Sequence, residues 1–385
     1  MVYLDYAATT PLRPEVLETI KNALELDFGN PSSIYQIGKK TKRKISSARE
    51  SIAKLLGIIP NNLYFTSGAT EANNWAIIHQ AQTARKLGKG NHIVASAIEH
   101  PSVRETLVFL EQEGFEITWI YPDENKHITL QAFEAASTSK TTGWVAMAIN
   151  NEVGAILPTV DLGKSAKQLG YWFHVDGVQA IGHQLKTLIP YVTSLSVSAH
   201  KFYGPKGIGF LVYQPWETAM LLKPFIHGGS QESSKRAGTE NTPYILGMAK
   251  ALELSLDEAA ETQANLFEIN QYLIEQLDNS AITFAINGDN DSRANHIINL
   301  WLPGFSSSQL LIQMDLAEIF VSAGSACSAG SLEDSLILKA YYPDDSQRWQ
   351  ESIRLSFGNQ TTKEDIDKFI VQLNLIKERN HSYGI

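Results

Sequence analysis

The chain has 385 residues, 43% of them hydrophobic and 19% charged, so it can bury a large core and is expected to divide into two domains. A formal net charge of -9 argues against a nucleic-acid partner, because no general positive field is present to offset phosphates. The single cysteine excludes an internal disulfide and Cys-rich metal sites, and the histidines lack metal-binding spacing, so we expect no metal.

The amino-terminal stretch has neither a basic region nor a sustained apolar run, and no later segment approaches the length of a membrane-spanning helix. We therefore expect a cytoplasmic protein without membrane contact. A dense basic run at residues 39–44 leads into Ile45 and Ile52 at helical spacing. This pattern is typical of a helix with a solvated basic face.

Short apolar runs alternate with amphipathic stretches between residues 60 and 213. Such alternation predicts a mainly parallel sheet covered by helices on both faces, with polar motifs at the carboxyl ends of the strands. The predicted strands are Leu63–Thr66, Ile93–Ala97, Ile117–Tyr121, Val145–Ile149, Trp172–Val175, Leu195–Ala199 and Gly209–Tyr213.

The turn after the first of these strands, residues 67–71, leads into a predicted helix. Free backbone amides at Ala69 and Thr70, together with the positive end of the helix dipole, form an anion site suited to a phosphate. Ser198 and His200, at the end of a later strand, supply further donors. A plain N-capped helix explains residues 67–71 equally well when they are taken alone.

Two more polar groups follow strands of the same sheet. His100 comes after the second strand, where an imidazole can stack on a flat ring and exchange protons near neutral pH. Asn151 belongs to an Asn-Asn-Glu-Val-Gly segment whose amides can bond a ring oxygen or a substrate. A loop or capping histidine is the ordinary alternative for His100.

Asp176 and Lys201 end two successive strands, and Gln179 follows the acid by three residues. A partly desolvated lysine can form a Schiff base, and a carboxylate can keep a pyridine nitrogen protonated. Pyridoxal phosphate (PLP) requires both groups, so the pair predicts a PLP site. Either residue alone is more simply interpreted as a loop charge.

The carboxyl-terminal part has a different pattern. Residues 245–280 are helical in character, two strand-like runs follow at Ile297–Leu302 and Ile353–Phe357, and a capping box at 361–365 opens a final helix. This composition predicts a smaller α+β domain. Arg354, on the second of these strands, suits bidentate capture of an amino-acid carboxylate, with a surface arginine as the alternative.

Cys327 lies among small polar residues and two glycines, in Val-Ser-Ala-Gly-Ser-Ala-Cys-Ser-Ala-Gly-Ser. A lone cysteine is more often a small buried hydrophobe than a nucleophile. This neighbourhood instead predicts an exposed, mobile loop that can carry a thiolate to a bound substrate.

The whole chain resembles the cysteine desulfurases of the NifS/IscS type, which are PLP enzymes of aminotransferase fold type I. Many ordered motifs carry the resemblance over nearly the full length: residues 3–10, 28–33, 67–71, 150–154, 174–179, 198–201, 228–232, 236–241, the Cys327 loop and the Arg354 strand. The resemblance implies an α/β fold with a large, mainly parallel seven-stranded sheet domain and a smaller α+β domain. The large PLP-binding domain would span residues 12–255, and the small domain residues 1–11 and 256–385.

The resemblance also implies cofactor roles. Lys201 would bind PLP as a Schiff base, Asp176 would pair with the ring nitrogen, and His100 would stack on the ring. The remaining cofactor contacts would be Ala69, Thr70, Asn151, Gln179, Ser198 and His200.

Substrate and partner roles come from the same source. Arg354, with Asn151, would bind the substrate carboxylate, and Cys327 would take the sulfur as a persulfide. Thr239 matches the position that reaches the phosphate of the partner subunit, which implies a homodimer. The implied reaction converts L-cysteine to L-alanine, with Lys201 and His100 moving protons, and passes sulfur to an iron–sulfur scaffold or another acceptor.

Other readings use the same residues differently. A PLP-dependent cysteine or cystine C–S lyase, or an aminotransferase, needs no loop cysteine. A Cys–His thiol hydrolase leaves Lys201 and Asp176 without a role. A non-catalytic scaffold would not need an intact set of Lys201, Asp176 and Arg354.

Overall fold

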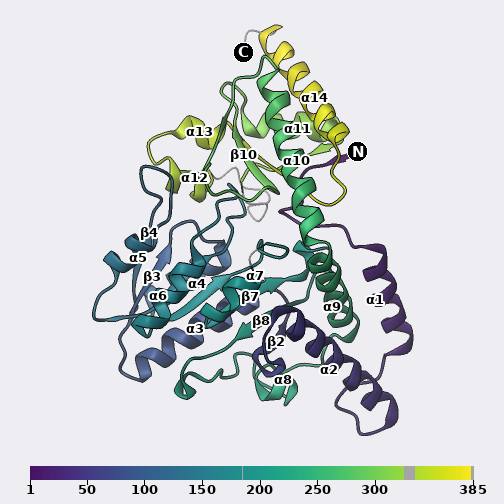
Figure 1. Cartoon of the computed structure of the whole chain (residues 1–385), viewed down its shortest axis with the longest axis vertical. Coiled ribbons are helices and arrows are strands. Elements are labelled where there is room, and N and C mark those ends of the chain that lie inside the picture. The colour runs from purple at the N-terminus through teal and green to yellow at the C-terminus, as the bar shows by residue number, and fades with distance from the viewer. Residues whose placement is uncertain (184, 325–333, 383–385) are drawn as a thin grey trace.

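A computed structural model describes residues 1–183, 185–324 and 334–382 of the chain (Figure 1). A broad layered part contains the large sheet, and a smaller part, with both termini, lies at one end of the long axis of the molecule. Helices α9 (Thr242–Asp257) and α10 (Ala259–Asp278) run from the first part into the second. The helical character predicted for residues 245–280 is confirmed, with a break at Glu258.

Seven strands form the large sheet, as predicted. Their order is β2-β8-β7-β6-β5-β3-β4, and all neighbouring pairs are parallel except those that β8 makes with β2 and β7. Carboxyl ends of the parallel strands therefore meet at one edge. The strands are β2 (Leu63–Thr66), β3 (His92–Ser96), β4 (Glu116–Ile120), β5 (Thr141–Met147), β6 (Trp172–Asp176), β7 (Ser194–Ser198) and β8 (Gly209–Tyr213).

Both faces of the sheet are buried except at the edge strand β4, so apolar residues lie on both faces of most of its strands. Successive residues alternate between two cores: Ile93 packs with α3 and α4 on one face, and Val94 packs with α5, α6, α7 and α9 on the other. The covering helices are α3 (Ala69–Lys86), α4 (Pro101–Gln112), α5 (Leu130–Ala136), α6 (Thr159–Leu169) and α7 (Leu185–Leu188). This packing holds the strand-end loops on a rigid frame.

The smaller part has a core of its own. It packs β10 (Ile297–Trp301) and β12 (Ser352–Ser356) against α10 and α14 (Lys363–Ser382). β9 (Ala285–Ile286) extends this antiparallel sheet, while β1 (Val2–Tyr3) pairs in parallel with β11 (Ile319–Phe320). This core is separate from those of the large sheet, but the boundaries given above for the two domains remain a prediction.

The remaining helices complete the two parts. They are α1 (Pro14–Leu26), α2 (Gln36–Leu56), α8 (Gln231–Ser234), α11 (Ser307–Leu316), α12 (Leu336–Tyr341) and α13 (Ser346–Gln350). The capping box of the final helix is present, since the Thr362 amide donates to Asp365 Oδ2 and the Asp365 amide donates back to Thr362 Oγ1.

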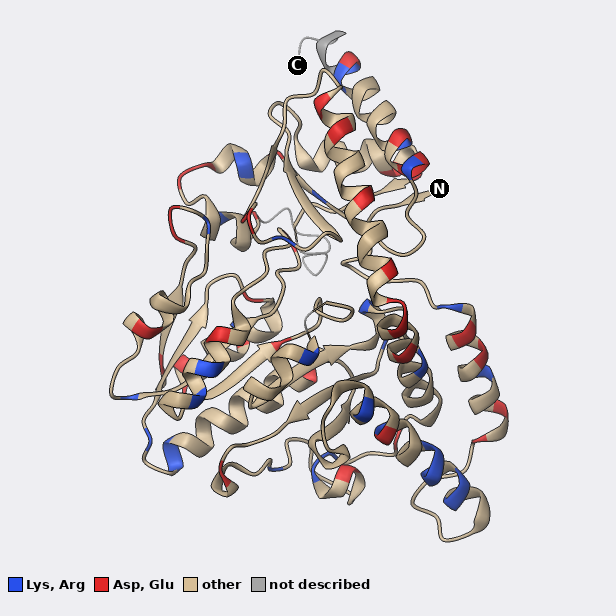
Figure 2. Ribbon diagram, viewed as in Figure 1, with Lys and Arg blue, Asp and Glu red and all other residues tan. Residues whose placement is uncertain are grey.

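The basic run lies on α2, where Figure 2 shows the Lys and Arg positions of the ribbon gathered near one end of the helix. Lys39, Lys40, Lys42 and Arg43 are exposed, as expected for a solvated face. Among the described residues, every helix is too short or too polar to cross a bilayer.

Candidate active site

A cavity of about 480 Å³ opens at the carboxyl edge of the large sheet. Its lining brings together residues from the amino-terminal segment, four strand ends, the start of α3 and β12. Of the residues predicted for the site, the cavity is lined by Ala69, Thr70, His100, Asn151, Asp176, Gln179, Ser198, His200, Lys201 and Arg354. Cys327 lies outside the described residues, and Thr239 is exposed and lines no part of this cavity.

Lys201 follows β7 in a short 3-10 turn, Ala199–Lys201, and is partly buried. Its Nζ donates to the carbonyls of Ala7 (2.6 Å) and Ala8 (2.8 Å). The amino-terminal segment therefore holds the amine at the cavity wall. Neighbouring His200 stays neutral at physiological pH, because burial, aided by the charges of Lys201 and Lys206, lowers its pKa to about 4.

Asp176 is buried at the end of β6 and is held by hydrogen bonds. The Val178 amide donates to its Oδ1 (3.0 Å), and Asn73 Nδ2 donates to its Oδ2 (3.0 Å). Asn73 is in turn oriented by His174, whose Nε2 lies 2.9 Å from Asn73 Oδ1. Because full burial lowers the pKa of His174 to about 3, this histidine is a neutral donor to Asn73.

The amino terminus of α3 faces the cavity and has no side-chain cap. Its first amides lack acceptors within the helix, which makes this end an anion site beside Ser198. Gly209 permits the arrangement, because a Cβ there would lie 2.3 Å from the Val197 carbonyl oxygen and 2.8 Å from the Cα of Gly68. Thus β8 packs directly against the turn that opens the helix.

His100 is the N-cap of α4, and its Nδ1 accepts a hydrogen bond from the Ser102 amide (3.1 Å). The Ser102 hydroxyl also lies 2.8 Å from Nδ1 and receives a hydrogen bond from Asn73. These contacts make Nδ1 an acceptor, so a neutral His100 carries its proton on Nε2. His100 can therefore cap α4 and stack on a ring at the same time.

Arg354 is 1% exposed and reaches the cavity from β12. Its Nη2 donates to Asp5 Oδ1 (2.7 Å) and its Nη1 donates to the Asn151 carbonyl (2.8 Å). Arg354 Nε and Asn151 Oδ1 are both buried without a hydrogen-bond partner. A surface arginine is excluded, and the two unpartnered atoms are suited to a ligand.

The described residues on either side of the Cys327 segment lie beside this site. The Ser322 amide donates to the Arg354 carbonyl (3.1 Å), and the Arg354 amide donates to the Ser322 carbonyl (2.6 Å). On the far side, the Ser335 hydroxyl donates to the Glu152 carboxylate, one residue from Asn151. Ser322 and Ser335, the described residues near the two sides of the undescribed segment, are therefore linked to Arg354 and Glu152.

These groups fit PLP. The cavity volume falls within the range of small-molecule sites. Its lining offers a buried carboxylate at Asp176, a partly buried amine at Lys201 and an uncapped helix terminus at Ala69, which match the ring nitrogen, the aldehyde and the phosphate. These three groups of the cofactor therefore each have a complementary group of this chain.

Sequence reasoning overlooked three supporting residues. Asp5 lies in the amino-terminal motif and could have been named as a site residue, but its ion pair with Arg354 spans 349 residues of sequence and could not be predicted. Asn73 lies one turn after Thr70, on the helix face that points to the sheet. Glu99 is buried behind Asp176 and accepts from the Met147 amide (2.7 Å), with burial raising its pKa to about 8.

Comparison with known proteins gives a consistent picture. The sequence model described as aminotransferase class-V matches residues 2–369. Cysteine desulfurase IscS of Dictyoglomus turgidum is 42% identical over 98% of this chain and 95% of its own length. Cysteine desulfurase IscS of Clostridium botulinum is 39% identical over the same shares. A solved structure titled NIFS-like protein superposes with a TM-score of 0.88 at 31% identity, covering 98% of this chain and 99% of that chain.

Proposed function

The chain belongs to the class-V aminotransferase family and is a PLP-dependent cysteine desulfurase, and we propose which of its residues perform the reaction and what assembly they require. The single observation that carries the proposal is the cavity in which Lys201, Asp176 and Arg354 meet. An amine, an acid and a guanidinium in one cavity provide for the cofactor and for an amino-acid substrate together.

PLP would be held by groups on four sides of the cavity. Lys201 would bind its aldehyde, and Asp176 would face its ring nitrogen. The start of α3, with Ser198, would bind its phosphate, and His100 would lie against the ring. When bound, the cofactor supplies an electron sink for the substrate carbon next to the amino group.

Substrate binding would fall to Arg354 and Asn151. The guanidinium is fixed by Asp5 and by the Asn151 carbonyl, so little side-chain entropy remains to be lost when a carboxylate binds. Its unpartnered Nε and the unpartnered Asn151 Oδ1 supply a donor and an acceptor. This pair suits the carboxylate and the amino group of L-cysteine.

Proton transfer would involve two residues. Lys201 Nζ takes the proton from the cysteine Cα, and His100 exchanges a proton at Nε2, the nitrogen opposite the one that contacts Ser102. The Cys327 thiolate then attacks the substrate sulfur. The carbon–sulfur bond breaks, its electron pair stays on the substrate carbon, which takes up a proton, and the products are L-alanine and a Cys327 persulfide. The contacts of Ser322 with Arg354 and of Ser335 with Glu152 support this role for Cys327, which lies between them in the sequence.

A homodimer is the proposed assembly. Thr239 is exposed and outside the cavity of its own chain, which suits a contact with the phosphate site of a partner subunit. Six large apolar side chains between Leu24 and Ile37 are also exposed, as expected of a surface that a second copy covers. An iron–sulfur scaffold or another thiol protein would accept the sulfur in the cytoplasm.

The decisive experiment measures alanine formed from L-cysteine in the presence of a thiol acceptor. Wild-type protein should form alanine, Cys327→Ala should form little, and the matched loop variant Ser325→Ala should behave like the wild type. Pyruvate in place of alanine would assign the protein to the C–S lyases. Full activity of Cys327→Ala would refute the role of this thiol.

A further inference from the structure

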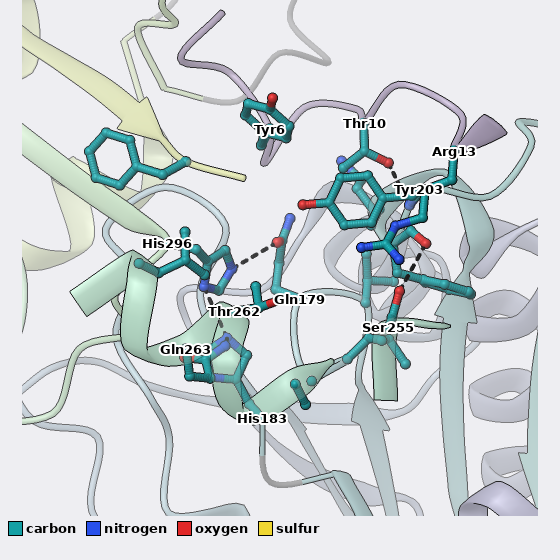
Figure 3. A pocket seen from close by; sticks show the side chains of 18 residues that line it. Tyr6, Thr10, Arg13, Gln179, His183, Tyr203, Ser255, Thr262, Gln263 and His296 are labelled. Carbon is teal, nitrogen blue, oxygen red and sulfur yellow. Dashed lines mark hydrogen bonds between the residues drawn. The ribbon is translucent and has the colours of Figure 1, made fainter. Parts of the chain in front are cut away.

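A second cavity lies next to the cofactor cavity and shares Val178, Gln179 and Lys201 with it (Figure 3). Its walls come from both parts of the molecule. The large part contributes His183, in the loop between β6 and α7, and the small part contributes His296, directly before β10. The Figure 3 view shows the two imidazoles facing one another, with His296 also facing Gln179.

Three contacts connect these side chains. His183 Nε2 lies 3.1 Å from His296 Nδ1, and His296 Nε2 lies 3.3 Å from Gln179 Oε1. Gln179 Nε2 donates to the Ala7 carbonyl at 3.1 Å, the same oxygen that accepts from Lys201 Nζ. A continuous path of hydrogen bonds therefore runs from the small part of the molecule to the proposed cofactor-binding amine.

Burial keeps both imidazoles neutral. It lowers the pKa of His183 to about 4, and burial together with the neighbouring His183 holds the pKa of His296 well below its usual value. A neutral imidazole has one N–H, so each ring has one donor and one acceptor nitrogen. The tautomers then follow once the orientation of the Gln179 amide is fixed.

The donor and the acceptor of each hydrogen bond in this path follow from the orientation of Gln179. Since its amide nitrogen donates to Ala7, its Oε1 is the acceptor that faces His296, and His296 carries its proton on Nε2. His296 Nδ1 is then an acceptor, and His183 must donate to it from Nε2. The nitrogen that lies 3.2 Å from His183 Nε2 is Gln263 Nε2, and since two donors cannot face each other, we assign the Gln263 amide the opposite orientation, with its oxygen toward that proton.

We propose that His183 and His296 are positioning residues that fix the amide of Gln179, so that its NH₂ group faces Ala7 and the cofactor cavity. Without the His296 donor, the two ends of the amide would be free to exchange, and its oxygen would repel the Ala7 carbonyl. The proposal rests on the proposed role of Gln179 as a cofactor contact, and it adds the reason why this contact has a defined orientation.

The tautomers are tested directly by long-range proton–nitrogen NMR of the full chain labelled at histidine. We expect a neutral His296 protonated on Nε2 and a neutral His183 also protonated on Nε2. Assignment of the signals uses His296→Gln and His183→Gln. A His296 protonated on Nδ1 would overturn the proposal, whatever the variants do.

The function is tested by the dissociation constant of PLP, measured on the holoenzyme by equilibrium dialysis and absorbance. His296→Leu should weaken PLP binding about tenfold, the effect of one lost hydrogen bond. His296→Gln, which keeps a donor, should stay within about threefold of the wild type. Equal affinity in wild type and His296→Leu would overturn the proposal, and His183→Leu provides the same test if the first variant does not fold.

A double-mutant cycle separates positioning from a structural effect. In a Gln179→Ala background, His296→Leu should cost no further PLP affinity, since its effect acts through the missing amide. A further tenfold loss there would show a merely structural role and refute the proposal. Unchanged affinity in Gln179→Ala alone would refute the cofactor role of Gln179, and with it the function of the path, independently of the tautomers.

Discussion

Replacing Arg354 with leucine should lower both stability and catalysis, by amounts that the structure allows to be worked out. The guanidinium is 1% exposed and donates to Asp5 and to the Asn151 carbonyl. Removing one member of a buried ion pair costs about 3–5 kcal/mol, because the other charge is left without a partner. Since the Asp5 side chain is 17% exposed and water can reach it, we expect the lower end of that range.

Catalysis should fall for a separate reason. A hydrogen bond from a charged group contributes about 1.5–3 kcal/mol, so loss of the contact between Arg354 and the substrate carboxylate should cost about 3 kcal/mol. This corresponds to a decrease of about 150-fold in kcat/KM for L-cysteine. Arg354→Lys, which keeps the charge but not the fork of donors, should lose less.

Asp5→Asn is the matched control. It removes the same ion pair but leaves the guanidinium, so its urea midpoint should fall while its kcat/KM stays within about fivefold of the wild type. Alanine formation at a series of L-cysteine concentrations gives kcat/KM for each protein. If Arg354→Leu keeps kcat/KM within threefold of the wild type, this arginine is structural only and the assigned substrate role is wrong.

Three further predictions concern titratable groups. Lys201→Ala should lose the yellow colour of the holoenzyme and alanine formation, and a protein that stays yellow after dialysis would contradict the covalent role. His174, with a folded pKa of about 3, binds fewer protons than in the unfolded chain, so its contribution to stability is present above pH 6.5 and is lost on acidification. Between pH 7 and pH 5 the wild type should lose about 2 kcal/mol more stability than His174→Gln by urea unfolding, and equal losses would show that this group does not contribute to the slope. Glu99 has the opposite sign, because its folded pKa of about 8 lies above the unfolded value, so its stabilisation is full below pH 4.5 and declines as pH rises toward 8. Glu99→Gln should remove that decline, and an unchanged pH dependence would argue against a protonated Glu99.

The large sheet was predictable because burial on both faces leaves a strong local signal. Most of its strands are short runs rich in apolar residues, and the predicted bounds of Leu63–Thr66 and Gly209–Tyr213 match the structure residue for residue. Residues at the ends of the strands could then be grouped, since parallel strands direct their carboxyl ends to one edge. Lys201, Asp176 and His100 were placed in one site by this argument.

Contacts between distant segments had no such signal. Asp5 and Arg354 are separated by 349 residues, and His183 and His296 by 113. The sequence indicates that each residue type is capable of an ion pair or a hydrogen bond, but the partner is chosen by how the two parts of the molecule pack. Bounds of helix ends and of the two domains depend on the same packing.

The amino-terminal segment has a consequence for synthesis of the protein. Val2 and Tyr3 pair with β11, the Ala7 amide donates to Ser356 Oγ, and Ala7 and Ala8 hold the Lys201 amine. These residues must therefore wait for partners that are synthesised as many as 349 residues later. The large sheet can assemble during translation, whereas the wall of the cavity that holds Lys201 is completed only after β12 has emerged, so a truncated chain would not acquire a finished site.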